Sequence, residues 1–361
     1  MTRKKSISTL ASVYIGTVIG AGFASGQEIL QFFGKQGMSG ILGVGLSTLL
    51  LAVIASKVLK KVYRQRIRNF EEFGAYYFSK RILTWINLIL AFLLLVGYFV
   101  MLAGSGAIVN EHFGFPAIYG IIVMSLLSFI VFNFGVNGIA KANNLIVPLL
   151  IGVIFVVTFF VVTNNRFFFS NLNAEIFLSF DSIKLFGTEI TIKNMIQIKT
   201  GWIWSAFVYA SHNSIGATVV MTSLLPLIYD ERAAEYGGIL GALVLGFMAS
   251  LILLCLLILY TDIIGLEVPM VAIAHSIGNI YKQIYSLILL LAMFTTAIAN
   301  GYACILRFSY MTGWREGLVT IIICFIAIPL ATLGFKNLVS FFYPLFGYLG
   351  FLFIGTILVK R

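Results

Sequence analysis

The sequence predicts an all-α polytopic membrane protein: ten transmembrane helices in a 5+5 inverted repeat, with helices 1 and 6 discontinuous. Three observations predict this fold class. First, 60% of the 361 residues are hydrophobic and only 10% are charged, against about 25% charged in soluble domains. Second, ten apolar stretches are long enough to cross a membrane, which takes about 20 helical residues. Third, the first stretch of each half is interrupted by glycine or polar residues.

The composition excludes several classes of protein. A surface this apolar would not stay dispersed in water, which excludes a soluble enzyme and a nucleic-acid binder despite the net charge of +11. The three cysteines lie in apolar stretches and predict neither a disulfide framework nor a cysteine metal site. A basic start before an apolar run also matches a secretory signal peptide. Nine further stretches and the length of the first one favour a transmembrane helix instead.

The ten stretches contain no Lys or Arg, and their even number places both termini on one side. With the N-terminus inside, 17 of the 24 Lys and Arg residues are cytoplasmic and 7 are outside. Basic residues are retained in the cytoplasm, so we expect a multi-pass membrane protein with cytoplasmic N- and C-termini, in contact with membrane lipids. The stretches are Ser6–Phe33, Met38–Ser56, Ile82–Val109, Ala117–Phe134, Leu145–Val162, Gly201–Ile228, Gly237–Thr261, Tyr285–Leu306, Gly317–Leu333 and Leu338–Val359.

A hydrophilic interval, 163–200, separates the fifth and sixth stretches. We interpret 1–361 as one transporter domain in which this extracellular segment connects two five-helix repeats, 6–162 and 201–359. Because five is odd, the second repeat begins on the opposite side of the membrane, so the repeats are inverted.

The first stretch contains Gly20, Gly22 and Gly26 within seven residues, followed directly by Gln27 and Glu28. This glycine density weakens a helix at mid-membrane, and the freed backbone must then line a protein cavity. Close helix packing through the two GxxxG spacings is the alternative. The polar residues after the last glycine favour a broken helix. The string also approximates a dinucleotide fingerprint, but it lacks the preceding strand that such a site requires.

The sixth stretch carries a second polar run, which begins Ala210-Ser211 as the first one begins Ala24-Ser25. Paired interruptions at equivalent places in two repeats point to a transporter binding site. We therefore predict a break near Tyr209 to Gly216, facing the break near Gly20 to Gly26.

Glu28 is the only carboxylate inside the ten stretches, and His212 is the only histidine inside them. Ionisable groups in a membrane are costly and usually face a cavity or a partner. The structural alternatives remain open: local hydrogen bonding for Glu28, and a neutral packed imidazole for His212. In the eighth stretch, Thr295 and Thr296 either bond to the preceding helical turn or supply oxygen ligands to a small cation.

The inverted arrangement, the glycine-rich first stretch, the polar sixth stretch and the paired threonines resemble the amino acid-polyamine-organocation (APC) superfamily with its LeuT-like fold. Within it, the run from Ile15 to Glu28 most resembles the YkvI-type bacterial membrane proteins, which are akin to branched-chain amino acid carriers. The resemblance in topology covers essentially the whole chain, whereas the motif is specific only for the first stretch.

The resemblance implies two sites. Main-chain N–H groups of the first break would bind a substrate carboxylate, and the sixth stretch would supply side chains to the pocket. In sodium-coupled members, two hydroxyl residues of the eighth helix bind Na⁺ together with carbonyls of the first. The substrate residues implied are Gly20, Gly22, Phe23, Ala24, Ser25, Gly26, Glu28, Phe207, Tyr209, Ser211, His212 and Asn213; the Na⁺ residues are Thr17, Gly20, Thr295 and Thr296.

From these features and the resemblance we expect a symporter of a small amino acid or related organic solute in the bacterial cytoplasmic membrane, working by alternating access and coupled to Na⁺, with no enzyme activity and no further cofactor. The fifth stretch has no basic residue that could replace Na⁺, because Lys141 precedes it. Two alternatives remain: an H⁺-coupled carrier that uses Glu28 or His212, and a ligand-sensing subunit, resembling those of spore germinant receptors, that binds an amino acid without transport.

Overall fold

The computed structural model describes residues 2–134, 139–165 and 192–359. Within these ranges the chain is helical and contains no strand. The helices are α1 (Arg3–Val18), α2 (Ala21–Ala24), α3 (Gln27–Phe32), η1 (Gly34–Gln36), α4 (Ser39–Gln65), α5 (Phe70–Tyr77), α6 (Lys80–Phe113), α7 (Ala117–Phe134), α8 (Ile139–Asn164), α11 (Ile192–Met221), η3 (Leu225–Leu227), α12 (Glu231–Ile258), α13 (Tyr260–Ile263), α14 (Pro269–Ile277), α15 (Asn279–Thr312), α16 (Glu316–Ala331) and α17 (Phe335–Val359).

The predicted membrane spans correspond to helices of this structure. Among the described residues, six helices are long and apolar enough to cross a membrane: α4, α6, α8, α12, α15 and α17. Two shorter apolar helices, α7 and α16, occupy the predicted fourth and ninth spans. The first predicted span is divided among α1, α2 and α3, and the sixth lies in α11. The chain is therefore a polytopic, all-helical membrane protein. Most of the connecting segment 163–200 lies outside the described residues.

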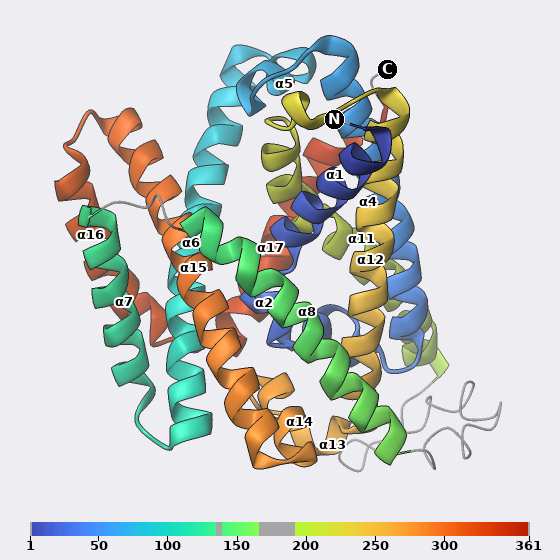
Figure 1. The fold of residues 1–361 in the computed structure, drawn as a ribbon, viewed down its shortest axis with the longest axis vertical. Helices are drawn as coiled ribbons and strands as arrows, with labels where there is room; N and C mark the ends of the chain where they lie inside the picture. Colours follow the sequence, from blue (N-terminus) through green and yellow to red (C-terminus); the bar gives the residue numbers. More distant parts are fainter. Residues whose placement is uncertain (1, 135–138, 166–191, 360–361) are drawn as a thin grey trace.

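The two halves repeat the same order of elements. A short helix, α5 or α14, follows the second span of each half, and each third span, α6 or α15, is 34 residues long and ends at a left-handed glycine. Figure 1 shows α5 and α14 at opposite ends of the bundle. The packing is also reciprocal, because α1 contacts α12 and α11 contacts α4. Two inverted repeats related by a pseudo-two-fold axis produce this exchange.

The predicted break in the first span is confirmed, whereas the predicted break in the sixth is wrong. α11 is a continuous helix through Tyr209–Gly216. Its polar side chains bond within the helix: Ser214 Oγ donates to Ala210 O (2.6 Å) and Thr218 Oγ1 to Ser214 O (2.7 Å). Hydroxyl groups that bond one turn back are compatible with a continuous helix, so polarity alone did not interrupt this one.

Charged side chains join the first residues of α1 and the last turns of α4 to the start of α12, at the end of the bundle where the start of α1 and the end of α17 lie (Figure 1). We call this the termini end. Asp230 caps α12 by accepting a hydrogen bond from the amide of Ala233. This hydrogen bond and, to a smaller extent, the guanidinium of Arg3 lower the pKa of Asp230 below its usual value. The ion pairs are Arg3–Asp230 (2.5 Å), Lys60–Glu231 (3.8 Å), Lys60–Glu235 (3.2 Å) and Arg64–Glu231 (2.5 Å).

Candidate functional site

The first break leaves main-chain oxygens free at mid-bundle. α1 ends at Val18, and the amide of Gly20 donates to Val18 O (2.8 Å) rather than to Gly16 O one turn back. The last carbonyl groups of a helix lack intrahelical donors and carry its negative dipole end. The carbonyl oxygens in the last turn of α1 are therefore placed to attract a cation.

A cavity of about 290 Å³ adjoins this helix end. One wall of the cavity comes from the last turn of α11. This turn lies toward the termini end, because the next element, η3, is bonded to the start of α1: Ser6 Oγ donates to Leu227 O (2.6 Å). The cavity therefore lies between the break and the termini end. It is lined by Gly16, Thr17, Ile19, Gly20, Ile146, Val147, Leu150, Val220, Ala292, Thr296, Ala299 and Asn300.

The cavity brings together three of the four residues expected to hold Na⁺: Thr17, Gly20 and Thr296. The fourth, Thr295, is not part of the lining. It is 4% exposed, and its hydroxyl donates to Ala292 O (3.1 Å). Adjacent residues of a helix point about 100° apart; here Thr296 faces the cavity, whereas the hydroxyl of Thr295 bonds to its own helix.

The electrostatics of this cavity suit a monovalent cation. Its lining holds no charged side chain, and its polar groups are the hydroxyls of Thr17 and Thr296, the amide of Asn300 and the main chain of the break. The hydroxyl of Thr17 donates to Val13 O (2.8 Å), which leaves its lone pairs free to accept or ligate. Neutral oxygens at a helix C-terminus are typical of Na⁺ sites in discontinuous transporter helices.

Glu28 lies beyond the break, in the first turn of α3. It is 4% exposed, and no other Asp or Glu of the described ranges is as deeply buried. Asn213 Nδ2 on α11 donates to Glu28 Oε1 (3.1 Å). The other carboxylate oxygen lies 3.4 Å from the position that a Cβ on Gly22 would take. A hydrogen bond thus links the two spans in which the sequence predicted a shared site.

Aromatic rings from α3, α11 and α17 surround this linkage. The imidazole of His212 stacks on Tyr343, with centroids 4.5 Å apart. The ring of Tyr209 meets Phe33 edge-on at 4.9 Å. We call this group the aromatic cluster; it comprises Phe32, Phe33, Tyr209, His212, Tyr343 and Phe346.

Phe207 does not share this surface. Its side chain is 40% exposed, whereas that of Tyr209 is 2% exposed. In a continuous helix, the side chains of residues i and i+2 point about 200° apart, so Phe207 and Tyr209 lie on opposite faces. The resemblance implied Phe207 as a pocket residue, and its place on the exposed face of the continuous α11 corrects that expectation. Tyr209, His212 and Asn213 follow the i, i+3, i+4 spacing and share one face.

The remaining predicted residues of the break are closely packed. Gly22, Phe23, Ala24 and Ser25 are buried, and Ser25 Oγ donates to Gly22 O (2.7 Å). None of these four residues lines the cavity at the end of α1. The amides expected to bind a substrate carboxylate are therefore enclosed in this conformation.

Gly22 is close to Tyr343, and this contact gives a first prediction. A Cβ on Gly22 would lie 2.7 Å from Tyr343 Oη, so Gly22→Ala is expected to destabilise the protein by about 1–3 kcal/mol through overpacking. Denaturant unfolding in detergent measures this. Adding Tyr343→Phe removes the contacting oxygen and should recover part of the loss; simple additivity in the double variant would contradict the contact.

Tyr285 of α15 holds the end of α2 and gives a second prediction. Its hydroxyl donates to Ala24 O (2.6 Å) in a buried position. Tyr285→Phe should cost about 1–3 kcal/mol because the carbonyl loses its donor. The matched control is Tyr281→Phe on the same helix, since the Tyr281 hydroxyl makes no hydrogen bond within the described chain. Equal unfolding midpoints for the two variants would contradict this role.

Sequence reasoning missed Tyr343 and Tyr285. Both lie in apolar spans with ordinary tyrosine content, so no local pattern marked them. Asn300 could have been found, because it follows the two threonines by one helical turn and therefore shares a face with Thr296.

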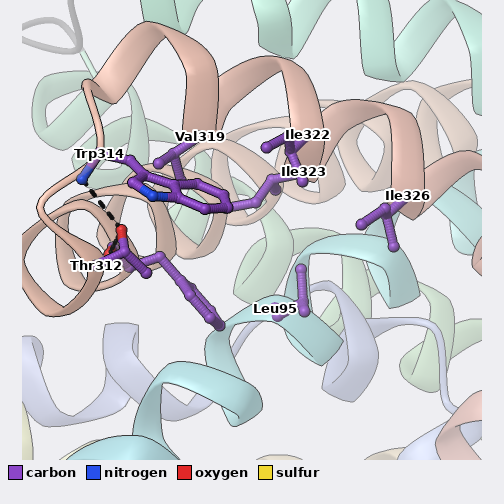
Figure 2. Close-up of a pocket in the computed structure, with 8 residues that line it drawn as sticks. Leu95, Thr312, Trp314, Val319, Ile322, Ile323 and Ile326 are labelled. Atoms are coloured by element: carbon purple, nitrogen blue, oxygen red, sulfur yellow. Dashed lines mark hydrogen bonds between the residues drawn. The ribbon is translucent and has the colours of Figure 1, made fainter.

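A second hollow, of about 120 Å³, lies between α6, α15 and α16 (Figure 2). Its polar contact is local: Trp314 N donates to Thr312 Oγ1 (3.2 Å). The other lining residues are Leu95, Phe308, Val319, Ile322, Ile323 and Ile326. Without convergent polar groups it cannot orient a polar solute, so the candidate site is the break in the first span.

Comparisons with known proteins support a transporter fold. No family model matches the chain. It is 30% identical over 358 residues to the membrane protein YkvI of Bacillus subtilis (strain 168), covering 99% of this chain and 97% of that one. The protein YyaD of the same organism is 22% identical over 350 residues, covering 96% of this chain and 94% of YyaD.

Solved structures of the Eremococcus coleocola manganese transporter are also similar. A variant of it is 15% identical, with 97% of this chain and 78% of that chain covered and a TM-score of 0.57. Its complex with an aromatic bis-isothiourea substituted compound is 14% identical, with coverage of 99% and 79% and a TM-score of 0.56. At such identities the similarity shows that the fold is shared.

Proposed function

Because the chain belongs to the YkvI family of bacterial membrane proteins and has a transporter fold, we propose that it is a secondary transporter. It moves a small amino acid or related organic solute by alternating access and couples this to Na⁺. Its place in the APC superfamily, its cytoplasmic termini and its location in the cytoplasmic membrane are part of the same proposal. One observation carries it: the cavity at the first break, where Thr17 and Gly20 meet Thr296 of the other repeat.

Na⁺ is favoured over H⁺ by the composition of the cavity. Thr17, Thr296 and Asn300 offer neutral oxygens, and the α8 wall is formed by Ile146, Val147 and Leu150. Such a lining has no group that takes up a proton, but it can stabilise a small cation without burying an extra formal charge. Coupling to H⁺ would have to involve Glu28 or His212 on the far side of the break.

Manganese, the cargo of the structural neighbours, is not favoured. The described residues contain no group of three or more His, Cys, Asp and Glu side chains that could hold a metal ion. A divalent cation at mid-membrane needs such ligands to offset its desolvation. Glu28, alone beside an amide and aromatic rings, does not form this kind of site.

Measurements on purified protein in proteoliposomes test the proposal. Substrate counterflow over a panel of amino acids should show exchange of at least one solute, and uptake should increase with Na⁺ at fixed pH and ionic strength. Thermal unfolding with and without Na⁺ reports the ion site independently of the solute. Uptake that ignores Na⁺ and follows an imposed pH gradient would establish the H⁺-coupled alternative. Binding without counterflow would establish the ligand-sensing alternative.

A further inference from the structure

Glu28 is a buried acid that lacks a cationic partner. We infer that its carboxylate binds the ammonium group of the transported solute, so that the substrate class is organic primary amines, amino acids included. This inference rests on the proposed transport function and goes further, because it assigns the charged group of the solute to a residue of the chain.

The described chain supplies no positive charge to Glu28. The ion pairs of Arg3, Lys60 and Arg64 lie at the termini end, and none of them involves Glu28. The one hydrogen bond that Glu28 receives from a side chain comes from the neutral amide of Asn213. A buried carboxylate without a cation is strongly unfavourable, so a ligand that brings a positive charge gains a favourable interaction here.

The surroundings suit an ammonium group. Tyr343 of the aromatic cluster reaches the space beside Gly22 that Glu28 Oε2 also borders, and aromatic faces attract cations within about 6 Å. Two buried polar atoms, each on a residue next in sequence to Glu28 or Asn213, also have no hydrogen-bond partner in the described chain: Gln27 Oε1 and His212 Nδ1. Each can accept a hydrogen bond, if the imidazole proton is on the other nitrogen, and an ammonium group has three donors.

Other charged ligands fit less well. A carboxylate beside Glu28 would meet a charge of the same sign, which is unfavourable at short range in a low-dielectric site. A metal ion would find one carboxylate and no second acid among the buried side chains of the described chain. An ammonium group satisfies the carboxylate with a single opposite charge and hydrogen bonds.

Access to Glu28 requires movement of the aromatic cluster. Tyr343 Oη occupies the space in front of Gly22, and Glu28 Oε2 borders the same space. The Na⁺ cavity lies on the termini side of α2, whereas Glu28 lies on the other side. The two sites can therefore be tested separately.

A matched panel tests the inference: common amino acids, the amine that each yields on decarboxylation, and the carboxylic acid that each yields on loss of the amino group. For wild-type protein, thermal shifts and counterflow are expected with compounds that carry the amine and not with the deaminated acids. Glu28→Gln keeps the shape of the side chain and should weaken amine binding about tenfold to a hundredfold, the range for a lost charged hydrogen bond.

Two variants serve as controls. Glu71→Gln removes an exposed acid of α5 and should bind amines as the wild type does. Glu28→Asp keeps the charge and should retain the preference for amines at reduced affinity. The stabilisation of Glu28→Gln by Na⁺ should match that of the wild type, which shows that the variant is folded and that its ion site is intact.

The outcomes separate the inference from the proposed function. Counterflow of a solute without an amine, or wild-type amine affinity in Glu28→Gln, overturns the inference and leaves transport standing. If Glu28→Gln keeps its amine affinity but its uptake no longer responds to a pH gradient, Glu28 carries a proton, and the inference is overturned. Amine binding without counterflow would support the inference and overturn transport. No binding of any amine by the wild type overturns the inference.

Discussion

Thr296→Ala should weaken the Na⁺ dependence of uptake, with a loss of at least about tenfold in apparent Na⁺ affinity, the cost of one ligand worth about 1.4 kcal/mol. The hydroxyl of Thr296 lines the cavity at the end of α1, and alanine leaves no oxygen there. Na⁺ titrations of uptake and of thermal stability measure the effect. Thr296→Ser restores the hydroxyl and should recover most of the affinity.

Thr295→Ala is the matched control for this experiment. The side chain of Thr295 donates to Ala292 O and does not line the cavity, so the variant should keep the Na⁺ response of the wild type. Equal losses in both threonine variants would indicate that the hydroxyls act through helix packing. An unchanged response in both would remove α15 from the ion site.

Gly238→Ala should destabilise the fold by about 3 kcal/mol, the upper part of the range for overpacking. A Cβ at this position would lie 2.8 Å from Ser56 N and 2.9 Å from Ala55 C. These are backbone atoms of α4, so no side-chain rotation can make room, and the two helices must separate. The midpoint of denaturant unfolding in detergent, together with the yield of folded protein, measures the loss.

Gly45→Ala is the corresponding control on α4. A Cβ there meets nothing within 4 Å, and alanine is the better helix former by about 1 kcal/mol. This variant should be as stable as the wild type or more stable. Equal destabilisation by the two substitutions would mean that the close approach of α4 and α12 does not limit stability.

The apolar spans and the first break were predictable because each depends on local composition. About 20 apolar residues form a transmembrane helix wherever they occur, since lipid satisfies no backbone group. Three glycines within seven residues weaken any helix in the same way. Both features therefore appear in the sequence before any tertiary contact is known.

The sixth span shows where such reasoning fails. The polar run from Ser211 to Ser214 resembles an interruption, but the hydroxyl of Ser214 bonds back to the helix, and no glycine run weakens the backbone between Tyr209 and Asn213. A polar residue can interrupt a helix or be accommodated within it, depending on the competition between local and tertiary hydrogen bonds. Composition does not reveal the outcome of this competition.

The sequence alone determined the membrane class, the spans, the first break and the two unusual ionisable residues, because these follow from residue type and short-range spacing. Only the tertiary structure decided that Thr296 and not Thr295 faces Thr17, that Asn213 donates to Glu28, and that Tyr343 packs on Gly22. These choices depend on the rotation of each helix about its axis. That rotation is set by packing between residues far apart in the chain, such as Gly238 against α4.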